Sequence, residues 1–170
     1  MKIQDSGTRR EFKSGAVRDI AEGKGRCDLL PLDVISLLLK NDYILKSIND
    51  YIYSGDKRYI TNAIGFFAVH RYKSSLTAIL EVAKHYEDGC NKYGSRNWER
   101  GIDLHCYIDS GVRHYLKWLR GDTDEAHDRA FIWNMLGALW THEHKPELID
   151  LPFAEKKKRC IEVKVSNKKN

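Results

Sequence analysis

Acidic, basic and amide side chains recur among apolar residues between positions 81 and 134, where a folding core alone would not require them. A buried polar group without a partner costs roughly 1–3 kcal/mol, so such residues need another reason to be there. The candidates are Glu81, His85, Asp109, Arg113, His114, Glu125, His127, Asp128 and Asn134. Carboxylates on different helices of a bundle can converge on one metal ion. We therefore expect the chemistry of the protein in this stretch.

Helical spacing places several of these side chains on common faces. Glu81 and His85 stand four residues apart and so share one face of a helix. Asp109 and Arg113 have the same spacing, which fits either an ion pair on a solvated face or a partly buried pair with a function. The helix expected over residues 104–119 is apolar on most sides, which favours the partly buried pair.

His127 and Asn134 stand seven residues apart, so they lie almost directly above one another on a helix. The neighbours of Asn134 are strongly apolar, and a buried asparagine needs up to four hydrogen-bond partners. Its amide either caps neighbouring backbone groups or faces a polar cavity that also receives His127. The sequence is compatible with both.

Two loops could complete a binding site. Residues 23–26 place two glycines beside Lys24 and Arg26, and the backbone N–H groups of glycine-rich turns can bind phosphate. Their spacing matches neither a P-loop nor a dinucleotide-binding fingerprint, so an ordinary N-terminal loop that packs onto a helix is the alternative. Tyr93 and Trp98 give a second loop aromatic surface, which could stack on a base or simply support the loop.

Apolar residues at helical spacing predict the elements that must hold these side chains. Pro31, Asp42 and Ser74 are suitable helix-start residues. We assign four apolar stripes to the core: Leu32, Ile35, Leu38 and Leu39; Ile44, Leu45, Ile48, Tyr51 and Ile52; Tyr59, Ile60, Ala63, Ile64, Phe67 and Ala68; and Leu76, Ile79, Leu80 and Ala83. With the two helices that follow, they predict an all-α bundle of five or six helices.

Length and composition describe a single globular domain. The chain has 170 residues, of which 42% are hydrophobic and 31% charged. We expect a flexible N-terminus over residues 1–14, one helical catalytic domain over 15–150 and a basic tail over 151–170. Much of the net charge of +5 lies in that tail, which we interpret as a solvated end. No apolar run approaches a membrane span or a signal segment, so we expect a cytoplasmic protein without a membrane partner.

The four cysteines are far apart in the sequence and form no Cys-x-x-Cys pair: Cys27, Cys90, Cys106 and Cys160. This spacing argues against a structural zinc site, and a cytosolic protein should not carry disulfides. We therefore expect free thiols, and no serine or cysteine stands out as a nucleophile activated by a neighbouring base. The alternating segment 160–165 predicts a short strand or an extended tail.

Separated motifs occur in a fixed order between residues 15 and 140. They are Gly15-Ala-Val-Arg18-Asp19 with Gly23-Lys24-Gly-Arg26-Cys-Asp28-Leu-Leu-Pro31; Glu81-Val-Ala-Lys84 with Lys92-Tyr-Gly94 and Arg96-Asn-Trp98-Glu99-x-Gly101; Asp109 with Arg113-His114; and Gly121, His127 and Trp133-Asn134. Together they resemble the phage dATP/dGTP diphosphohydrolase family, the MazZ-type enzymes.

The resemblance implies an all-α fold related to MazG-like nucleotide pyrophosphohydrolases. It also implies Mg²⁺-dependent cleavage of dGTP, or of dATP, to the monophosphate and pyrophosphate, with Mn²⁺ as a substitute cation. Enzymes of this kind supply dGMP to phages whose DNA carries 2-aminoadenine in place of adenine. The expected setting is the cytoplasm of the infected bacterium, with a small-molecule nucleotide as the partner, no nucleic-acid partner, and a homo-oligomeric enzyme.

The resemblance further implies roles for single residues. Glu81 and Asp109 would be catalytic, and these two with Glu125 or Asp128 would be metal ligands, one of them also orienting the attacking water. The substrate would be held by Lys24, Arg26, Asn97, Arg113, His114, His127 and Asn134.

The chain departs from the family pattern at three places. Position 84 is lysine, so there is no Glu-x-x-Glu of the MazG type at Glu81. Position 130 is alanine, where the family often has a second histidine. Residues 41–73 form an extra helical segment compared with shorter members of the family.

Two other classes of function compete with this hypothesis. The adjacent pair His127-Asp128 is found in HD-domain phosphohydrolases, which release triphosphate and need a further histidine and aspartate from other helices. His85, His114 and Asp109 are the candidates for those places. A basic helical protein with aromatic loops could instead bind nucleic acid without catalysis. Against this, much of the basic excess lies in the tail and the central stretch is acidic.

Overall fold

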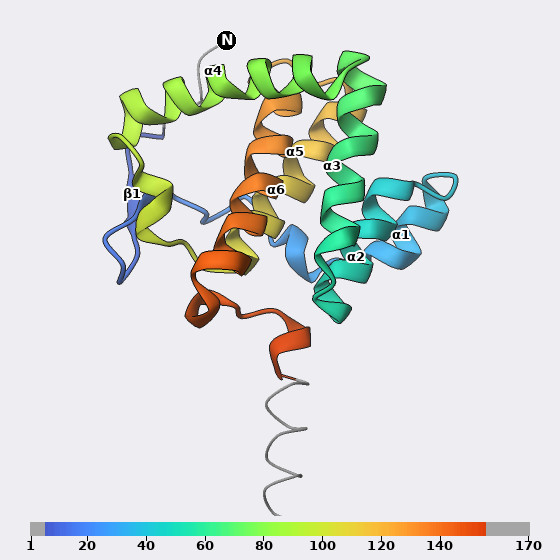
Figure 1. Cartoon of the computed structure of the whole chain (residues 1–170), viewed down its shortest axis with the longest axis horizontal. Helices are drawn as coiled ribbons and strands as arrows, with labels where there is room; N and C mark the ends of the chain where they lie inside the picture. Colours follow the sequence, from blue (N-terminus) through green and yellow to red (C-terminus); the bar gives the residue numbers. More distant parts are fainter. Residues whose placement is uncertain (1–5, 156–170) are drawn as a thin grey trace, which may run out of the picture.

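The computed structural model describes residues 6–155, which form a helical bundle with one small hairpin (Figure 1). The helices are α1 (Leu32–Leu38), α2 (Tyr43–Ser54), α3 (Lys57–Tyr72), α4 (Ser75–Tyr93), α5 (Leu104–Arg120) and α6 (His127–His144). Single 3-10 turns lie at η1 (Cys27–Leu29), η2 (Asn97–Arg100) and η3 (Pro146–Leu148). The all-α fold class predicted from the sequence is confirmed.

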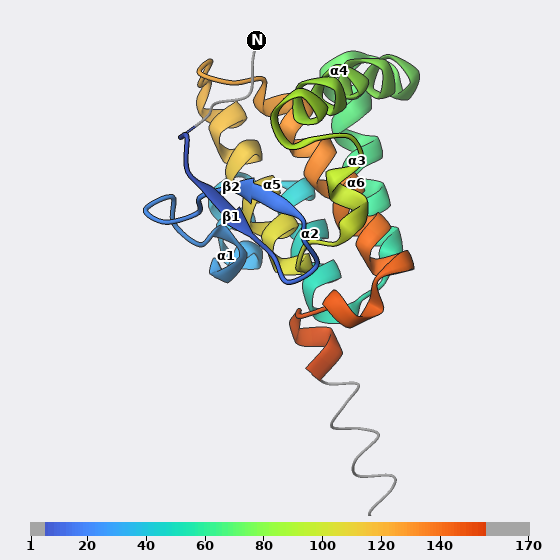
Figure 2. The same ribbon diagram turned by 90° about the vertical axis from the view of Figure 1, so that its left-hand side faces the viewer.

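The N-terminal hairpin lies against the side of the bundle, below the second half of α4 (Figure 2). Strands β1 (Arg9–Glu11) and β2 (Val17–Asp19) pair antiparallel, with Arg10 opposite Arg18. Part of the segment predicted to be a flexible N-terminus is thus built into the fold, and Phe12 at the hairpin turn is buried. The domain boundaries themselves stay predictions. The strand or extended tail proposed for residues 160–165 lies outside the described residues, as does the basic run after 155.

Helices α5 and α6 form the central pair, and two glycines allow their close approach. A Cβ atom at Gly111 of α5 would lie 2.1 Å from Cε of Met135, and one at Gly137 of α6 would lie 2.3 Å from Cε1 of Tyr107. Each glycine therefore receives a side chain of the opposite helix. Because packed interiors leave no room for such overlaps, the spacing of these helices depends on the absence of two side chains.

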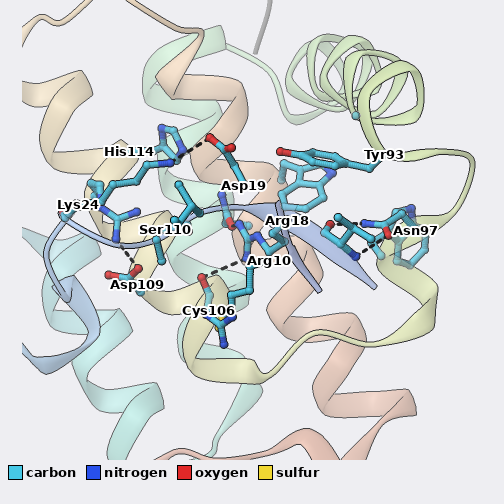
Figure 3. Close-up of a pocket in the computed structure, with 18 of the residues that line it drawn as sticks. Arg10, Arg18, Asp19, Lys24, Tyr93, Asn97, Cys106, Asp109, Ser110 and His114 are labelled. Atoms are coloured by element: carbon cyan, nitrogen blue, oxygen red, sulfur yellow. Dashed lines mark hydrogen bonds and ion pairs between the residues drawn. The ribbon is translucent and has the colours of Figure 1, made fainter. Parts of the chain in front are cut away.

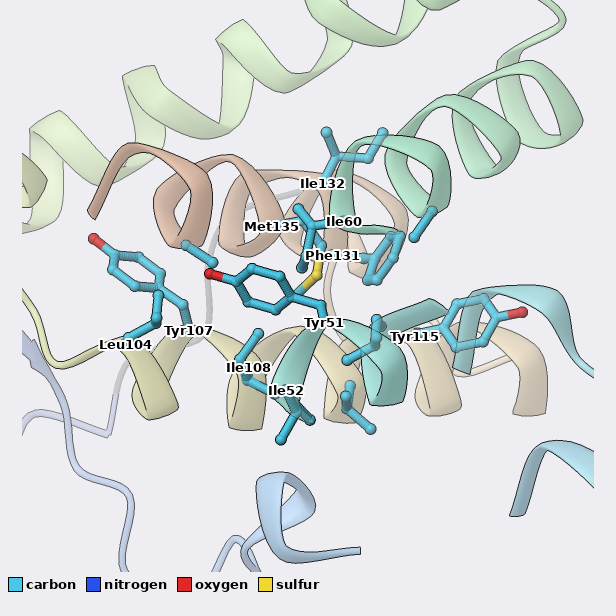
Figure 4. Close-up of a cluster of buried hydrophobic side chains, with 14 of the residues drawn as sticks. Tyr51, Ile52, Ile60, Leu104, Tyr107, Ile108, Tyr115, Phe131, Ile132 and Met135 are labelled. Atoms are coloured by element: carbon cyan, nitrogen blue, oxygen red, sulfur yellow. The ribbon is translucent and has the colours of Figure 1, made fainter. Parts of the chain in front are cut away.

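The hydrophobic core lies between α2, α3, α5 and α6 (Figure 4). The ring of Phe67 lies edge-on to Phe131 and Trp118, with centroids 4.7 and 4.9 Å away, an arrangement that adds to the energy of burial. Tyr51 of α2 is fully buried, and its hydroxyl hydrogen-bonds Nδ1 of His142 at 2.8 Å. This packing fixes the pair α5 and α6, which carries most of the polar residues identified in the sequence.

Helix starts agree with their sequence signals. The Asp42 carboxylate accepts a hydrogen bond of 2.8 Å from the Leu45 amide, and the Ser74 hydroxyl accepts one of 3.2 Å from the Leu76 amide. Pro31 is the residue just before α1 rather than its first residue. Within the described residues no helix is long and apolar enough to cross a membrane.

Three of the four predicted core stripes are partly or wholly on the surface, although on α3 the exposed member is Tyr59 alone. On α1, Leu38 is 77% exposed, although Leu32 is buried. On α4, Leu76 and Leu80 are 74% and 70% exposed, so the assignment of this stripe to the core was wrong. The reason is that α4 turns another face inward: Ala78 and Val82 contact the bundle, and the polar and aromatic residues that follow them face a cavity.

Candidate functional site

A cavity of about 690 Å³ lies between the hairpin and the helices α4, α5 and α6 (Figure 3). Its walls come from β2, the loop over residues 20–26, the second half of α4, the loop over 94–98, and the facing sides of α5 and α6. Seven lysines and arginines but only four acids line it, so its charge favours an anionic ligand. The volume is that of a small-molecule site.

One end of the cavity is aromatic. Tyr86, Tyr93, Trp98 and Trp133 line it, together with the imidazole of His85, whose ring centroid lies 5.9 Å from that of Trp133. Burial lowers the pKa of His85 to about 4, so this ring is uncharged at neutral pH. Flat, mostly uncharged rings provide a surface on which a nucleobase can stack. Tyr93 and Trp98 had been expected either here or as loop supports; both line the cavity, and Trp98 also packs against Trp140.

Arg18 on β2 lies inside the cavity, although the sequence analysis gave it no role (Figure 3). Its guanidinium lies 5.2 Å from the ring centre of Tyr107 and 5.5 Å from that of Trp133. It donates to the Cys106 carbonyl at 3.2 Å and to Oδ1 of Asn134 at 2.8 Å. These contacts join the hairpin to α5 and α6. The only signal in the sequence was its place in the motif Gly15-Ala-Val-Arg18-Asp19.

The glycine-rich loop packs onto α5 through the pair Asp109 and Arg113. The buried Asp109 carboxylate accepts a hydrogen bond of 2.6 Å from the Cys27 amide and pairs with Arg113. Arg113 also donates to the carbonyls of Lys24 and Gly25, at 3.2 and 3.1 Å. The partly buried interpretation of this pair is therefore confirmed. Its observed contacts hold the loop, while the expected metal and phosphate roles stay predictions.

Other residues expected to bind substrate also have structural contacts. Both ends of the buried Asn97 amide pair with the Val17 backbone, at 2.8 and 2.7 Å, and so fix β2 to the loop after α4. Lys24 contacts Asp19 at 3.1 Å. Arg26 forms a two-bond pair with Asp28, at 2.7 and 2.6 Å.

Asn134 satisfies the first of the alternatives left open by the sequence and part of the second. Its amide nitrogen donates to the Ala130 carbonyl at 2.8 Å, which caps local backbone. Its oxygen accepts from Arg18, and the residue lines the cavity. His127 does not line the cavity directly, because it lies behind His114 in a fully packed position.

At the other end of the cavity, His114, Glu125 and His127 turn three ligand atoms toward one another. Nδ1 of His114 lies 2.9 Å from Nδ1 of His127, and Oε2 of Glu125 lies 3.7 and 4.0 Å from these two nitrogens. The point equidistant from three atoms at these separations is about 2.1 Å from each, which is the usual bond length from imidazole nitrogen or carboxylate oxygen to a divalent zinc-like cation. The spacing therefore fits a small divalent metal ion.

The protonation of this cluster also suits a metal. Burial lowers the pKa of His114 well below its ordinary value, so its ring is neutral. Nε2 of His127 lies 2.7 Å from Oδ1 of Asp124, so a neutral ring with its proton on Nε2 would offer the lone pair of Nδ1 to a cation. Lys117 holds Asp124 at 2.9 Å, and this hydrogen bond is the main cause of the strongly lowered pKa of Asp124. The sequence did not assign a role to Asp124. The only signal was its position three residues before His127.

The structure does not bring the four predicted metal ligands together. Glu81 pairs with Lys84 and Arg129, and Asp128 accepts from Nε of Arg71 at 2.8 Å, both away from the cavity. Of the four, only Glu125 belongs to a group that could hold a metal within residues 6–155. An arginine-paired carboxylate is already neutralised, so a cation gains little from it.

The same arrangement bears on the His127-Asp128 pair of the HD hypothesis. His127 faces His114 and Asp124, whereas Asp128 faces Arg71 on α3. The two side chains therefore leave α6 in different directions and do not form one ligand set. Two further groups with ligand atoms close together are Asp122, Asp124 and His127, and Asp103, His105 and Cys106.

Comparison with known proteins identifies the family. A family model described as dATP/dGTP diphosphohydrolase, N-terminal, matches residues 56–151, which is more than half of the chain. The matched range contains α3 to α6, with the histidine and glutamate cluster and the aromatic wall. The hairpin and the glycine-rich loop precede it. No curated protein and no solved structure matches the chain.

Proposed function

The chain belongs to the dATP/dGTP diphosphohydrolase family, and we propose that it hydrolyses dGTP, or dATP, to the nucleoside monophosphate and pyrophosphate in the cavity beside α5 and α6. The observation that carries this proposal is the polarity of the cavity. Its histidine and glutamate cluster lies at one end with Lys24, and its aromatic wall with Tyr93 lies at the other (Figure 3). A triphosphate needs cations around it and a base needs flat aromatic surface, so a nucleotide could fill both ends of the cavity.

A bound divalent cation would neutralise charge on the phosphates and make a bound water more acidic. His114, Glu125 and His127 would hold it, with Asp124 and Lys117 fixing the orientation of His127. Two imidazoles and one carboxylate are the donors preferred by first-row transition cations, whereas Mg²⁺ prefers oxygen ligands. We therefore favour Mn²⁺ or a similar ion over the Mg²⁺ expected from the sequence.

The chain's own side chains would position the nucleotide. Arg18, fixed by Asn134 and by the Cys106 carbonyl, directs its guanidinium edge into the middle of the cavity, where sugar or phosphate oxygens would lie. Lys24 and backbone groups of the loop that Arg113 holds lie beside the phosphate end. The uncharged His85 and the neighbouring aromatic rings would stack on the purine and keep water from it.

The wider role follows the family resemblance. We propose that the dGMP formed supplies a phage whose DNA contains 2-aminoadenine, in the cytoplasm of its host. A homo-oligomer is supported by the exposed apolar residues of α1 and α4, such as Leu38, Leu76 and Leu80, because solvent-facing clusters of this kind mark interaction surfaces. Size-exclusion chromatography with light scattering would measure the oligomeric state.

Product identification in labelled water tests the reaction. We expect dGTP with Mn²⁺ in H₂¹⁸O to give dGMP and pyrophosphate, with the label in dGMP, because water attacks the α-phosphorus. Label in pyrophosphate would instead mean attack at the β-phosphorus. Deoxyguanosine with triphosphate would support HD-type chemistry. Absence of turnover with every deoxynucleoside triphosphate and cation would contradict the proposal and leave a binding function.

The cation is tested in the same assay. Excess EDTA should abolish turnover, and micromolar Mn²⁺ should restore it more effectively than equal Mg²⁺. Full turnover in EDTA would end the metal-centred account. Restoration by micromolar Mg²⁺ alone would contradict the nitrogen-rich ligand set and return attention to the oxygen ligands Glu81, Asp109 and Asp128.

A further inference from the structure

At the edge of the cavity, Asp150 holds the side chain of His105 through two contacts. Its Oδ1 accepts a hydrogen bond of 2.9 Å from the His105 backbone amide, and its Oδ2 accepts one from Nδ1 of the ring. The hydrogen bond to Asp150 is the main reason that the pKa of His105 rises to about 10. The ring is therefore an imidazolium at neutral pH, and its orientation is fixed.

The second ring nitrogen of His105 faces the thiol of Cys106. Nε2 lies 3.3 Å from Sγ, so its N–H points at the sulfur. Cys106 is also the third residue of α5, and the start of a helix carries partial positive charge. Both residues line the cavity, and Cys106 is 6% exposed.

We propose that Cys106 is a reactive thiol, whose sulfur faces the His105 ring that Asp150 holds in place, and a site of modification by small electrophiles and hydroperoxides. An imidazolium and a helix start are the two surroundings that most often activate cysteine. The order carboxylate, imidazole and thiol is also the order found in cysteine nucleophiles of enzymes. The sequence alone does not indicate a reactive thiol at Cys106. Asp150, the carboxylate that orients His105, is 45 residues away from it in the chain.

Oxidation at this site balances with the groups present and one hydroperoxide. The thiolate sulfur attacks one peroxide oxygen, an S–O bond forms and the O–O bond breaks. Sulfur loses two electrons and becomes a sulfenic acid, and the departing oxygen is reduced and takes the proton of His105 Nε2 to leave as water or alcohol. Where the cavity binds nucleotide as proposed above, the added oxygen beside Arg18 would hinder that binding.

The charges around Cys106 come from four segments. Arg18 on β2 donates to its carbonyl, and Arg26 on the glycine-rich loop lies within its electrostatic reach. Asp103 precedes α5, and Asp150 lies behind His105. The cations of the hairpin side thus add to His105. The carboxylate of Asp103 lies within 4.8 Å of the sulfur and pairs with Arg10 at 3.9 Å, whereas Asp150 acts through the imidazolium.

The other described cysteines are internal controls. Cys90 is exposed on α4 and lines the same cavity, so the same reagents reach it. Burial is the main cause of the raised pKa of Cys27, which makes that thiol a poor nucleophile. If accessibility alone set the rate of alkylation, Cys90 would react fastest. If contact with His105 activates the thiol, Cys106 would react fastest.

Alkylation of the intact protein decides between these rankings. The full chain, treated with EDTA, is exposed to iodoacetamide at pH 6.5, and the labelled peptides are quantified by mass spectrometry over time. We expect Cys106 to react about tenfold faster than Cys90, because the thiolate is the attacking species. We expect His105→Gln to slow Cys106 about tenfold without changing Cys90, and Asp150→Asn to slow it less. An unchanged, slow rate at the half-buried Cys27 shows that each variant is folded.

Three results would overturn the proposal. Cys90 could react as fast as Cys106, or His105→Gln could leave the Cys106 rate unchanged. The third is metal binding: Asp103, His105 and Cys106 have ligand atoms within 4.8 Å of one another. If the protein as isolated carried zinc and Cys106 reacted only after EDTA removed it, the cluster would be a metal site. Equal labelling with and without EDTA supports the reactive thiol.

Discussion

The two sides of helix α6 use carboxylates in opposite ways. On the side facing α3 and α4, Asp128 and Glu81 meet arginines, Arg71 and Arg129, and form ion pairs. On the cavity side, Glu125 meets two histidines, of which His114 is kept uncharged by burial. A carboxylate that is paired with an arginine offers little to a further cation. The residue that an acid contacts, more than its position on a helix, therefore indicates whether the acid has a structural role or could bind a metal ion.

The largest expected effect separates the two sides directly. Glu125→Gln should lower the turnover of dGTP at least about 100-fold, because it removes the anionic member of the proposed metal site. The matched variant Glu81→Gln replaces an acid of the ion-pair side and should stay within about threefold of the wild type. Steady-state pyrophosphate release measures both. Equal losses of turnover in Glu125→Gln and Glu81→Gln would contradict the proposed difference between the cavity side and the ion-pair side of α6.

Asp124→Asn tests whether the cavity side depends on support behind the histidines. Loss of the carboxylate that orients His127 should weaken Mn²⁺ binding about 10–100-fold, the range observed for residues behind metal ligands. Asp50→Asn is the control, because Asp50 pairs with Lys46 on the surface of α2 and does not line the cavity. Isothermal titration with Mn²⁺ reads the affinity without catalysis. An unchanged affinity in Asp124→Asn would mean that His127 is not a ligand.

The uncharged state of His85, which lines the cavity from α4, can be tested by pH. The pKa of His85 falls to about 4 in the folded protein, below its usual value of about 6.5, so the unfolded chain binds the proton more tightly. The contribution of His85 is therefore complete above about pH 6.5 and is lost as pH falls from there toward 4. Replacing His85 by Gln should reduce the acid-dependent loss of unfolding free energy in this window by about 1–3 kcal/mol. Denaturant melts at pH 4.5 and 7.5 measure it.

His70, which is exposed near the end of α3, provides the control for that experiment. His70→Gln should leave the acid limb as it is in the wild type. A change of equal size in both variants would mean that the acid limb reflects general protonation rather than the buried ring of His85.

The smallest effect belongs to the ion-pair side. Because Arg71 is 45% exposed, breaking its pair with Asp128 should cost about 0–1 kcal/mol of unfolding free energy and leave turnover unchanged. A double-mutant cycle with Arg71→Gln and Asp128→Asn measures the coupling. A large loss of turnover in Asp128→Asn would place this acid in the chemistry after all and would restore the sequence-based assignment.

Much of the fold could be predicted from the sequence, because helix starts and apolar periodicity are local signals. Asp42 and Ser74 cap the helices for which they were proposed. The stripe on α4 misled because period alone does not say which face of a helix is inward. Leu76 and Leu80 have the spacing of a core, but the bundle contacts Ala78 and Val82.

The candidate site was harder to predict, because it depends on contacts between distant segments. The sequence marked His114, Glu125 and His127, yet it grouped Glu125 with acids that the fold directs elsewhere. Arg18 reaches Asn134 across 116 positions, and no local pattern gives such a contact. Residue type indicated the chemistry, whereas the pairing of the residues required the packing of α5 on α6.

The two glycines between α5 and α6 bear on the size of the cation that His114 and His127 could bind. Gly111 and Gly137 allow the close approach of the helices α5 and α6, and this approach also brings Nδ1 of His114 within 2.9 Å of Nδ1 of His127. Ca²⁺ takes ligands at 2.3–2.6 Å, longer than the bonds of about 2.1 Å for which this gap is suited. At the separation that the structure shows, the two histidines would therefore suit a smaller cation better than Ca²⁺.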